Sequence, residues 1–158
     1  MMENLFNSIN VPHDRIHVPN GMASDFETEG KAYEAMIDAA GGLDLQILGI
    51  GNNGHIGFNE PSDTFSSITH KVELTESTIE ANTRFFASSD DVPRFAFTMG
   101  IGTIMKARSI VLVATGKSKA AAVKAMIKDD PSPKCPASIL QFHHNVTVFL
   151  DEEAAGLL

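Results

Sequence analysis

Short runs of apolar residues recur along the chain and are typical of buried β-strands. The clearest ones span residues 43–50, 94–100, 109–115 and 145–151. Each is apolar at nearly every position, without the alternation of a strand that has one side in water. A strand that is apolar on both sides suits a parallel sheet with helices on both of its faces. Residues 15–19 are a further, weaker strand candidate.

Segments with helical periodicity separate these runs. Residues 26–40 carry apolar side chains at helical spacing, Ser24 and Glu27 form a predicted capping box, and Gly41 can take the left-handed conformation that ends a helix. Further helices are predicted at residues 75–86, beginning at Thr75, and at residues 116–128. Alternating strands and helices predict an α/β fold with a Rossmann-like sheet of mostly parallel strands and helices on both faces.

Composition narrows the range of partners. The 158 residues are 43% apolar and 20% charged, as in ordinary globular proteins, and the formal net charge is −8. A negative surface without a basic run disfavours nucleic acid as a partner. No apolar run approaches the roughly 18 residues of a membrane span, so no membrane partner is expected. One cysteine, Cys135, and an N-terminus unlike a signal peptide favour a cytoplasmic protein.

The most distinctive stretch, "LGIGNNGHIGFNEP" at residues 48–61, follows the first predicted strand. Ligands of open α/β sheets bind at the carboxyl ends of strands. Gly49, Gly51 and Gly54 would let a ligand or another backbone come close. His55 is of the residue type that can exchange protons near neutral pH. If the loop folds back, the Glu60 carboxylate can hold one imidazole nitrogen and fix the tautomer. The bare pattern fits a structural turn equally well.

Two further segments carry candidate anion-binding residues. Lys117 and Lys119 lie in the first turn of a predicted helix, directly after the strand 109–115. Their positive charges oppose the helix dipole there. A bound anion would offset this cost and accept hydrogen bonds from the free backbone N–H groups. Arg84 has the planar fork that suits phosphate. The alternative is that none of the three binds an anion: both lysines are simply solvated on the helix surface, and Arg84 lies over neighbouring aromatic rings. The sequence fits this alternative equally well.

A metal site is not expected. His55 and Glu60 have no histidine or cysteine partner at ligand spacing, and the adjacent His143 and His144 should point apart in a strand.

The segments "GNNGHIGFNEP", "ELTESTIEANTRFF", "FTMGIGT" and "GKSKA" together resemble the glucosamine-6-phosphate deaminase family over the entire chain. The resemblance implies conversion of glucosamine 6-phosphate and water to fructose 6-phosphate and ammonia, without a cofactor. It implies that His55 opens the sugar ring and that Glu60 orients it. Asn53 takes the other position of this relay, where family members carry Asp or Asn. An asparagine there can orient the histidine but adds no negative charge to the relay.

The same resemblance implies how the substrate is held. Arg84 and Lys119 fall on the family's phosphate-binding positions, and Gly49 would lie against the sugar. The expected partner is therefore a small sugar phosphate, and the oligomeric state, monomer or homo-oligomer, stays open.

One departure concerns the segment with which the family normally begins. That segment holds a strand, a phosphate loop and the aspartate that removes the proton at C2, and the sequence shows no match to it. We therefore expect residues 1–158 to form one domain, corresponding to the C-terminal two-thirds of a deaminase domain. Without that segment part of the sheet would be uncovered, which predicts a poorly stable chain. The missing base should cost about 10²–10⁴-fold in rate, which predicts a nearly inactive chain.

Two alternatives remain. A 6-phosphogluconolactonase-like hydrolase would share the Gly-His loop but not the "GFNEP" continuation. A sugar-phosphate-sensing domain of the same fold would need the phosphate contacts but no His–Glu pair.

Overall fold

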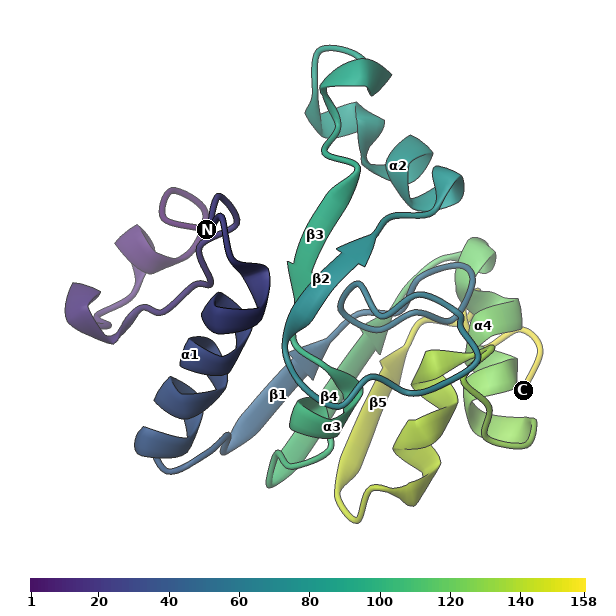
Figure 1. Cartoon of the computed structure of the whole chain (residues 1–158). Helices are drawn as coiled ribbons and strands as arrows, with labels where there is room; N and C mark the ends of the chain where they lie inside the picture. The colour runs from purple at the N-terminus through teal and green to yellow at the C-terminus, as the bar shows by residue number, and fades with distance from the viewer.

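A three-stranded parallel sheet organises the molecule, whose computed structural model describes all residues from 1 to 158 (Figure 1). Its strands are β1 (Leu45–Leu48), β4 (Ser109–Ala114) and β5 (Val146–Leu150). They lie in the order β1-β4-β5, and both neighbouring pairs are parallel. The predicted α/β class is therefore confirmed, and three of the four clearest predicted strands lie in this sheet.

A second, two-stranded sheet accounts for the fourth predicted strand. β3 (Phe95–Thr98) pairs antiparallel with β2 (His70–Glu73), outside the parallel sheet. The expectation that this run belongs to the parallel sheet is wrong. Its Phe97 side chain packs against Phe26 instead, with the two ring centroids 5.6 Å apart.

Helices connect the strands. The α-helices are α1 (Phe26–Ala39), α2 (Glu76–Asn82), α3 (Ile101–Ile104) and α4 (Ala120–Lys128). Short 3₁₀ helices add η1 (Phe6–Ser8), η2 (His13–Arg15), η3 (Thr83–Phe85), η4 (Ser89–Asp91), η5 (Lys117–Lys119) and η6 (Pro136–Phe142). None of these helices combines the length and apolar character needed to cross a membrane.

The start of the chain differs from the prediction in two places. Asp25, not the Ser24–Glu27 pair, caps α1, because its carboxylate accepts the backbone N–H groups of Glu27 and Thr28. Residues 15–19 form no strand, since Ile16 is extended but no neighbouring strand lies beside it. The end of α1 is as predicted, with Gly41 at φ +91°.

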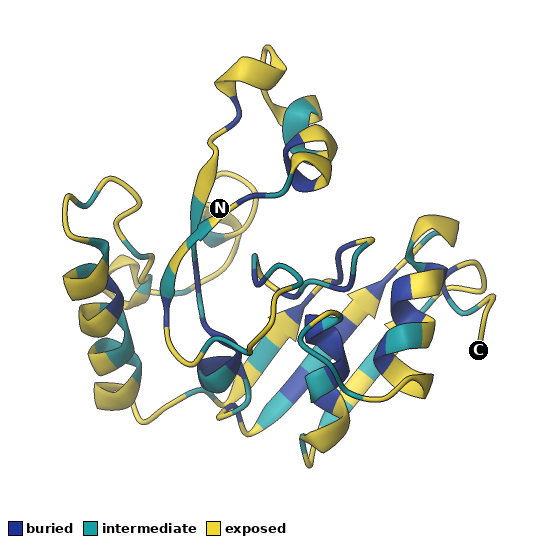
Figure 2. Cartoon of the chain, turned by 45° about the vertical axis from the view of Figure 1, so that its right-hand side comes forward, coloured by how far each residue is buried: buried dark blue, intermediate teal, exposed yellow.

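The core lies on one face of the parallel sheet. Ile104 of α3, Ile110 and Leu112 of β4 and Val123 of α4 are at most 1% exposed there. Figure 2 shows buried positions on the helices that cover this face, and exposed positions interrupting the strands. The opposite face is not covered, which corrects the expectation of helices on both faces. The helix α1 packs against β2 instead.

Candidate active site

The loop between β1 and β2 begins at the carboxyl end of β1, as the sequence predicts. It turns tightly, because the Gly54 N–H donates to the Gly51 carbonyl and the Gly51 N–H donates to the His55 carbonyl. A Cβ at Gly51 would lie 2.5 Å from the His55 ring, and a Cβ at Gly54 2.6 Å from the Cys135 Sγ. These two glycines therefore make room for neighbouring side chains. Only Gly49, with nothing closer than 3.9 Å, leaves open space.

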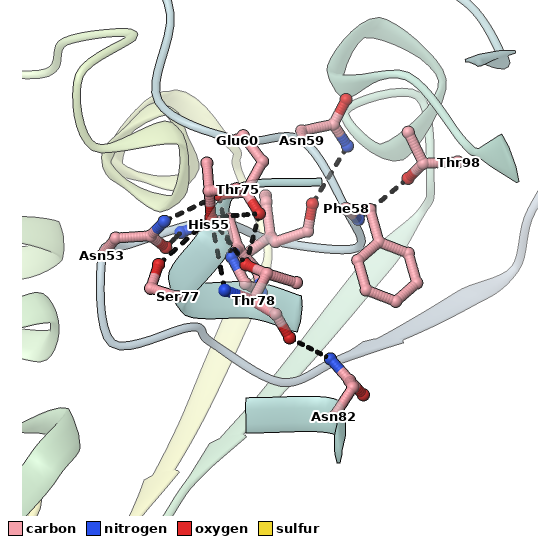
Figure 3. Close-up of polar contacts among 11 residues, drawn as sticks. Asn53, His55, Phe58, Asn59, Glu60, Thr75, Ser77, Thr78, Asn82 and Thr98 are labelled. Atoms are coloured by element: carbon pink, nitrogen blue, oxygen red, sulfur yellow. Dashed lines mark hydrogen bonds and ion pairs between the residues drawn. The ribbon is translucent and has the colours of Figure 1, made fainter. Parts of the chain in front are cut away.

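His55 and Glu60 lie together in this loop, as expected from a loop that folds back (Figure 3). The His55 Nδ1 lies 3.3 Å from the Glu60 Oε2. Asn53 contacts both residues: its Nδ2 donates to the same Glu60 oxygen at 2.6 Å, and its Oδ1 accepts the His55 backbone N–H at 3.2 Å. The three residues form one hydrogen-bonded unit, with the asparagine holding the carboxylate and the histidine backbone in register.

The other oxygen of Glu60 is held from α2. The Thr75 hydroxyl donates to Oε1 at 3.2 Å, and the Thr78 hydroxyl donates to the same atom. Neither threonine was predicted as a site residue; Thr75 was recognised only as the helix cap, a role it also has. The two threonines lie 15 and 18 residues after Glu60 in the sequence, so only the folded structure reveals these contacts.

This hydrogen-bond network controls the charge of Glu60, whose side chain is only 7% exposed. Burial alone would raise the pKa of this carboxyl group. Hydrogen bonds from His55, Thr78 and Asn53 outweigh burial and lower the pKa to about 2. An ionised carboxylate only accepts hydrogen bonds, so the His55 Nδ1 must carry the proton they share. In the neutral ring, Nε2 is then the free acceptor.

A cleft of about 350 Å³ lies beside this unit. It is lined by five of the six predicted site residues, Gly49, Asn53, His55, Arg84 and Lys119. Glu60 is the exception, since it is not among the lining residues and contacts the cleft through three residues that are, His55, Asn53 and Thr78. No aspartate or glutamate lines the cleft.

Two cations line the same cleft without a carboxylate partner. Burial and the nearby charge of Arg84 lower the pKa of Lys119. Neither residue forms a salt bridge, although the Arg84 guanidinium also lies over the Phe85 ring, 4.7 Å from its centroid. Two mutually repelling cations beside a cleft are suited to an anionic group.

The segment before α4 corrects part of the anion prediction. The Gly116 N–H donates to both carboxylate oxygens of Asp151, at 3.0 and 2.9 Å, and the Lys117 N–H donates to the Glu153 Oε2. These groups are therefore not free to bind a ligand, because carboxylates after β5 already cap them. Of the two lysines, only Lys119 lines the cleft.

The histidine pair near the C-terminus also differs from the prediction. The rings of His143 and His144 stack with centroids 4.6 Å apart instead of pointing apart, because both residues precede β5. His143 Nδ1 accepts the Asn145 N–H, and Nε2 donates to the Ala107 carbonyl. No group of three or more His, Cys, Asp or Glu side chains could hold a metal ion.

Together, the fold and the cleft define an α/β protein with a cleft at the carboxyl edge of a parallel sheet, lined by a histidine and two cations. A sequence model described as "Glucosamine-6-phosphate isomerases/6-phosphogluconolactonase" matches residues 1–149. The chain belongs to this family.

Individual relatives agree with this assignment. The chain is 56% identical to a glucosamine-6-phosphate deaminase of Thermoanaerobacter sp. (strain X514) and 59% identical to one of Alkaliphilus oremlandii (strain OhILAs). Each alignment covers all of this chain but 62% and 66% of the relative, so the chain spans less than two-thirds of their length.

Solved structures show the same pattern. A monomeric glucosamine-6-phosphate deaminase superposes with a TM-score of 0.95 at 48% identity, over 99% of this chain and 65% of that one. A 6-phosphogluconolactonase from Trypanosoma cruzi is more distant, with a TM-score of 0.58 at 26% identity over 83% of this chain and 51% of that one.

Proposed function

We propose that this chain carries the ring-opening and phosphate-binding part of a glucosamine-6-phosphate deaminase. The whole reaction converts glucosamine 6-phosphate and water to fructose 6-phosphate and ammonia. One observation carries the proposal: a histidine backed by an ionised carboxylate and a pair of unpaired cations line the same cleft. Relatives with the deaminase name are 54–59% identical over all 158 residues.

His55 is the proposed proton shuttle. With Nδ1 held by Glu60, the neutral imidazole presents Nε2 to the substrate. Nε2 takes the proton of the anomeric hydroxyl and returns it to the ring oxygen as the C1–O5 bond breaks and the C1 carbonyl forms. The negative charge of Glu60 stabilises the imidazolium that exists between the two transfers. Asn53 orients both partners and contributes no charge of its own.

Arg84 and Lys119 are the proposed phosphate ligands. The guanidinium can hold two phosphate oxygens at once, whereas the ammonium acts as a point charge. A doubly charged phosphate would relieve the repulsion that lowers the pKa of Lys119. Gly49 has no side chain, so the sugar can lie against its backbone.

The later proton transfer at C2 needs a second base. Because no carboxylate lines the cleft, we propose that this base comes from polypeptide outside residues 1–158. Those residues would then correspond to the C-terminal two-thirds of a deaminase domain. Ammonia release by the isolated chain should be slower than in a complete deaminase by about 10²–10⁴-fold or more.

The test separates ring opening from deamination. The purified chain is mixed with glucosamine 6-phosphate; exchange between its α and β anomers is followed by NMR saturation transfer, and ammonia is measured in parallel. We expect faster anomer exchange with little ammonia. The matched variant His55→Gln should keep phosphate binding and lose the exchange. Unchanged exchange in that variant would remove His55 from the mechanism, and rapid ammonia release by the chain would refute the missing base.

A parallel assay with 6-phosphogluconolactone as substrate distinguishes the two alternatives. A 6-phosphogluconolactonase-like enzyme would hydrolyse 6-phosphogluconolactone, whereas a sensing domain would bind sugar phosphate without accelerating either reaction. Neither alternative is favoured by an observation, because a sensing domain has no use for the His55–Glu60 pair and the lactonases are the more distant relatives.

A further inference from the structure

The turn that carries Lys119 into the cleft is held from the end of the chain. It begins at Gly116, whose φ of +89° lets the backbone leave β4 in a conformation that other residues rarely adopt. The Gly116 N–H donates to both carboxylate oxygens of Asp151, which directly follows β5. The residues after β5 lie beside α4 in both overall views (Figure 1 and Figure 2). One carboxylate therefore ties the turn after β4 to the end of the neighbouring strand.

A second hydrogen bond passes this constraint on to Lys119. The Gly116 carbonyl accepts the Lys119 N–H at 3.0 Å, so Gly116 is fixed by Asp151 on one side and joined to Lys119 on the other. The Asp151 Oδ1 also accepts the Ala154 N–H at 2.8 Å, and Ala154 is fully buried. Although Asp151 is itself exposed, its carboxylate is thus anchored on a residue of the core.

Asp151 acts on the backbone of this turn and not on the charge of Lys119. The pKa of the ammonium group is lowered by burial and by Arg84, and no carboxylate contributes to it. Glu153, the second carboxylate after β5, likewise accepts a backbone group, the Lys117 N–H, at 3.2 Å. The two carboxylates therefore hold the turn in place while the ammonium group stays available to the cleft.

We propose that Asp151 is a positioning residue for Lys119 and sets the place where the ammonium group meets the phosphate of the substrate. This role rests on the function proposed above, in which Lys119 and Arg84 hold the phosphate. A lysine has a flexible stem, so the reach of its ammonium group depends on where its backbone is held. Because Arg84 repels that group, releasing the turn would let it move out of the cleft toward water.

The test separates position from charge. Glucosamine 6-phosphate is titrated into the 158-residue chain and its variants by calorimetry. Asp151→Ala removes the tether and should weaken binding by about 3–10-fold. Loss of a negative charge would by itself strengthen the binding of a phosphate, so the direction of the change distinguishes the two effects. Glu152→Ala is the matched control: this exposed neighbour carries the same charge but holds neither Gly116 nor Lys117, so affinity should be unchanged or slightly higher.

A double-variant cycle tests whether the effect passes through Lys119. In a Lys119→Met background, Asp151→Ala should cause no further loss of affinity. The rate of anomer exchange at saturating substrate should also stay unchanged, because His55 is not touched. Unchanged or tighter binding in Asp151→Ala, or an equal loss with and without Lys119, would overturn the proposal.

Two further measurements keep the outcome decisive. Urea denaturation checks that each variant is folded; if Asp151→Ala unfolds, Asp151→Asn, which keeps the shape and one acceptor oxygen, takes its place in the same cycle. If Lys119→Met and Arg84→Gln leave the affinity unchanged, the proposed phosphate site itself fails. If both weaken binding and the Asp151 variant does not, only the positioning role fails.

Discussion

The hydroxyl of Thr78 donates to the Glu60 carboxylate, and this contact joins α2 to the loop that holds His55. α2 runs directly into η3, which carries Arg84. One short segment thus both supports the carboxylate behind the proposed proton shuttle and positions a proposed phosphate ligand. A displacement of α2 would change both parts of the cleft together.

Replacing Thr78 by valine tests this support. The change keeps the shape of the side chain but removes a hydroxyl that holds a buried carboxylate, which should cost about 1–3 kcal/mol of unfolding free energy. The pKa of Glu60 should rise from about 2 toward its ordinary 4.5. Urea denaturation and ¹³C NMR titration of the Glu60 carboxyl group measure the two effects. Thr78→Ser keeps the hydroxyl and should behave like the unmutated chain; a serine variant as impaired as the valine one would contradict the hydrogen-bond explanation.

Glu60 should also make stability depend on pH. Its pKa is lower in the folded chain than in the unfolded chain, so its stabilising contribution is complete above pH 4.5 and is lost as the pH falls toward 2. The full contribution is on the order of 3 kcal/mol. Unfolding free energies measured between pH 6 and pH 3 should therefore fall less steeply in Glu60→Gln. Identical pH dependence in the two proteins would show that the carboxylate is not stabilised by its neighbours.

The sequence predicted the contact between His55 and Glu60 but not the network around it. A Gly-rich loop after a strand must fold back, so a glutamate five residues from the histidine could be expected to meet it. The threonine contacts depend on where the first turn of α2 packs, which no local pattern reveals. The glycines were predicted to give clearance for a ligand, whereas Gly51 and Gly54 mainly accommodate His55 and Cys135.

The strands were located more reliably than their pairing. A short apolar run indicates burial, but it does not say which strand lies beside it or in which direction. Residues 94–100 were therefore placed correctly as a strand and wrongly in the parallel sheet. The cover on both faces was also expected from the apolar runs, and the exposed Ile47 and Phe149 show a face that these 158 residues leave open.

Changing Asn53 to aspartate tests the electrostatic role of that position. The Asn53 Nδ2 lies 2.6 Å from the Glu60 Oε2, so an aspartate would place a second carboxyl group at hydrogen-bond distance. Two such groups do not both ionise readily, and one apparent pKa of the pair should rise above 4.5. NMR titration of both carboxyl groups measures it. Asn52→Asp, which also adds a charge to the cleft but has no bond to Glu60, should leave the Glu60 titration near its original position.

The two cations should contribute to sugar-phosphate affinity in different ways. Arg84→Gln removes a bidentate ligand and should weaken binding of glucosamine 6-phosphate by about 10–100-fold, which corresponds to roughly 1.5–3 kcal/mol. Lys119→Met should weaken binding less, because a single ammonium is lost. Calorimetric titration measures both. Lys117→Met is the control, since this exposed lysine lies outside the cleft, and an equal loss there would indicate only a general effect of net charge.

Gly54 offers a test of how tightly the loop is held against η6. Its φ of +84° disfavours any side chain, and an added Cβ would also lie 2.6 Å from the Cys135 Sγ. Gly41 has a similar φ of +91° but no atom within 4 Å of an added Cβ, so Gly41→Ala should cost only the strain of about 1–2 kcal/mol. Gly54→Ala should cost more than this. Adding Cys135→Ala should recover the part of the excess that the Sγ causes but not the strain, as measured by urea denaturation of the single and double variants. Equal costs at the two glycines would mean that the loop can move away from Cys135, and His55 would then be held less rigidly than the contacts of Asn53 and Glu60 imply.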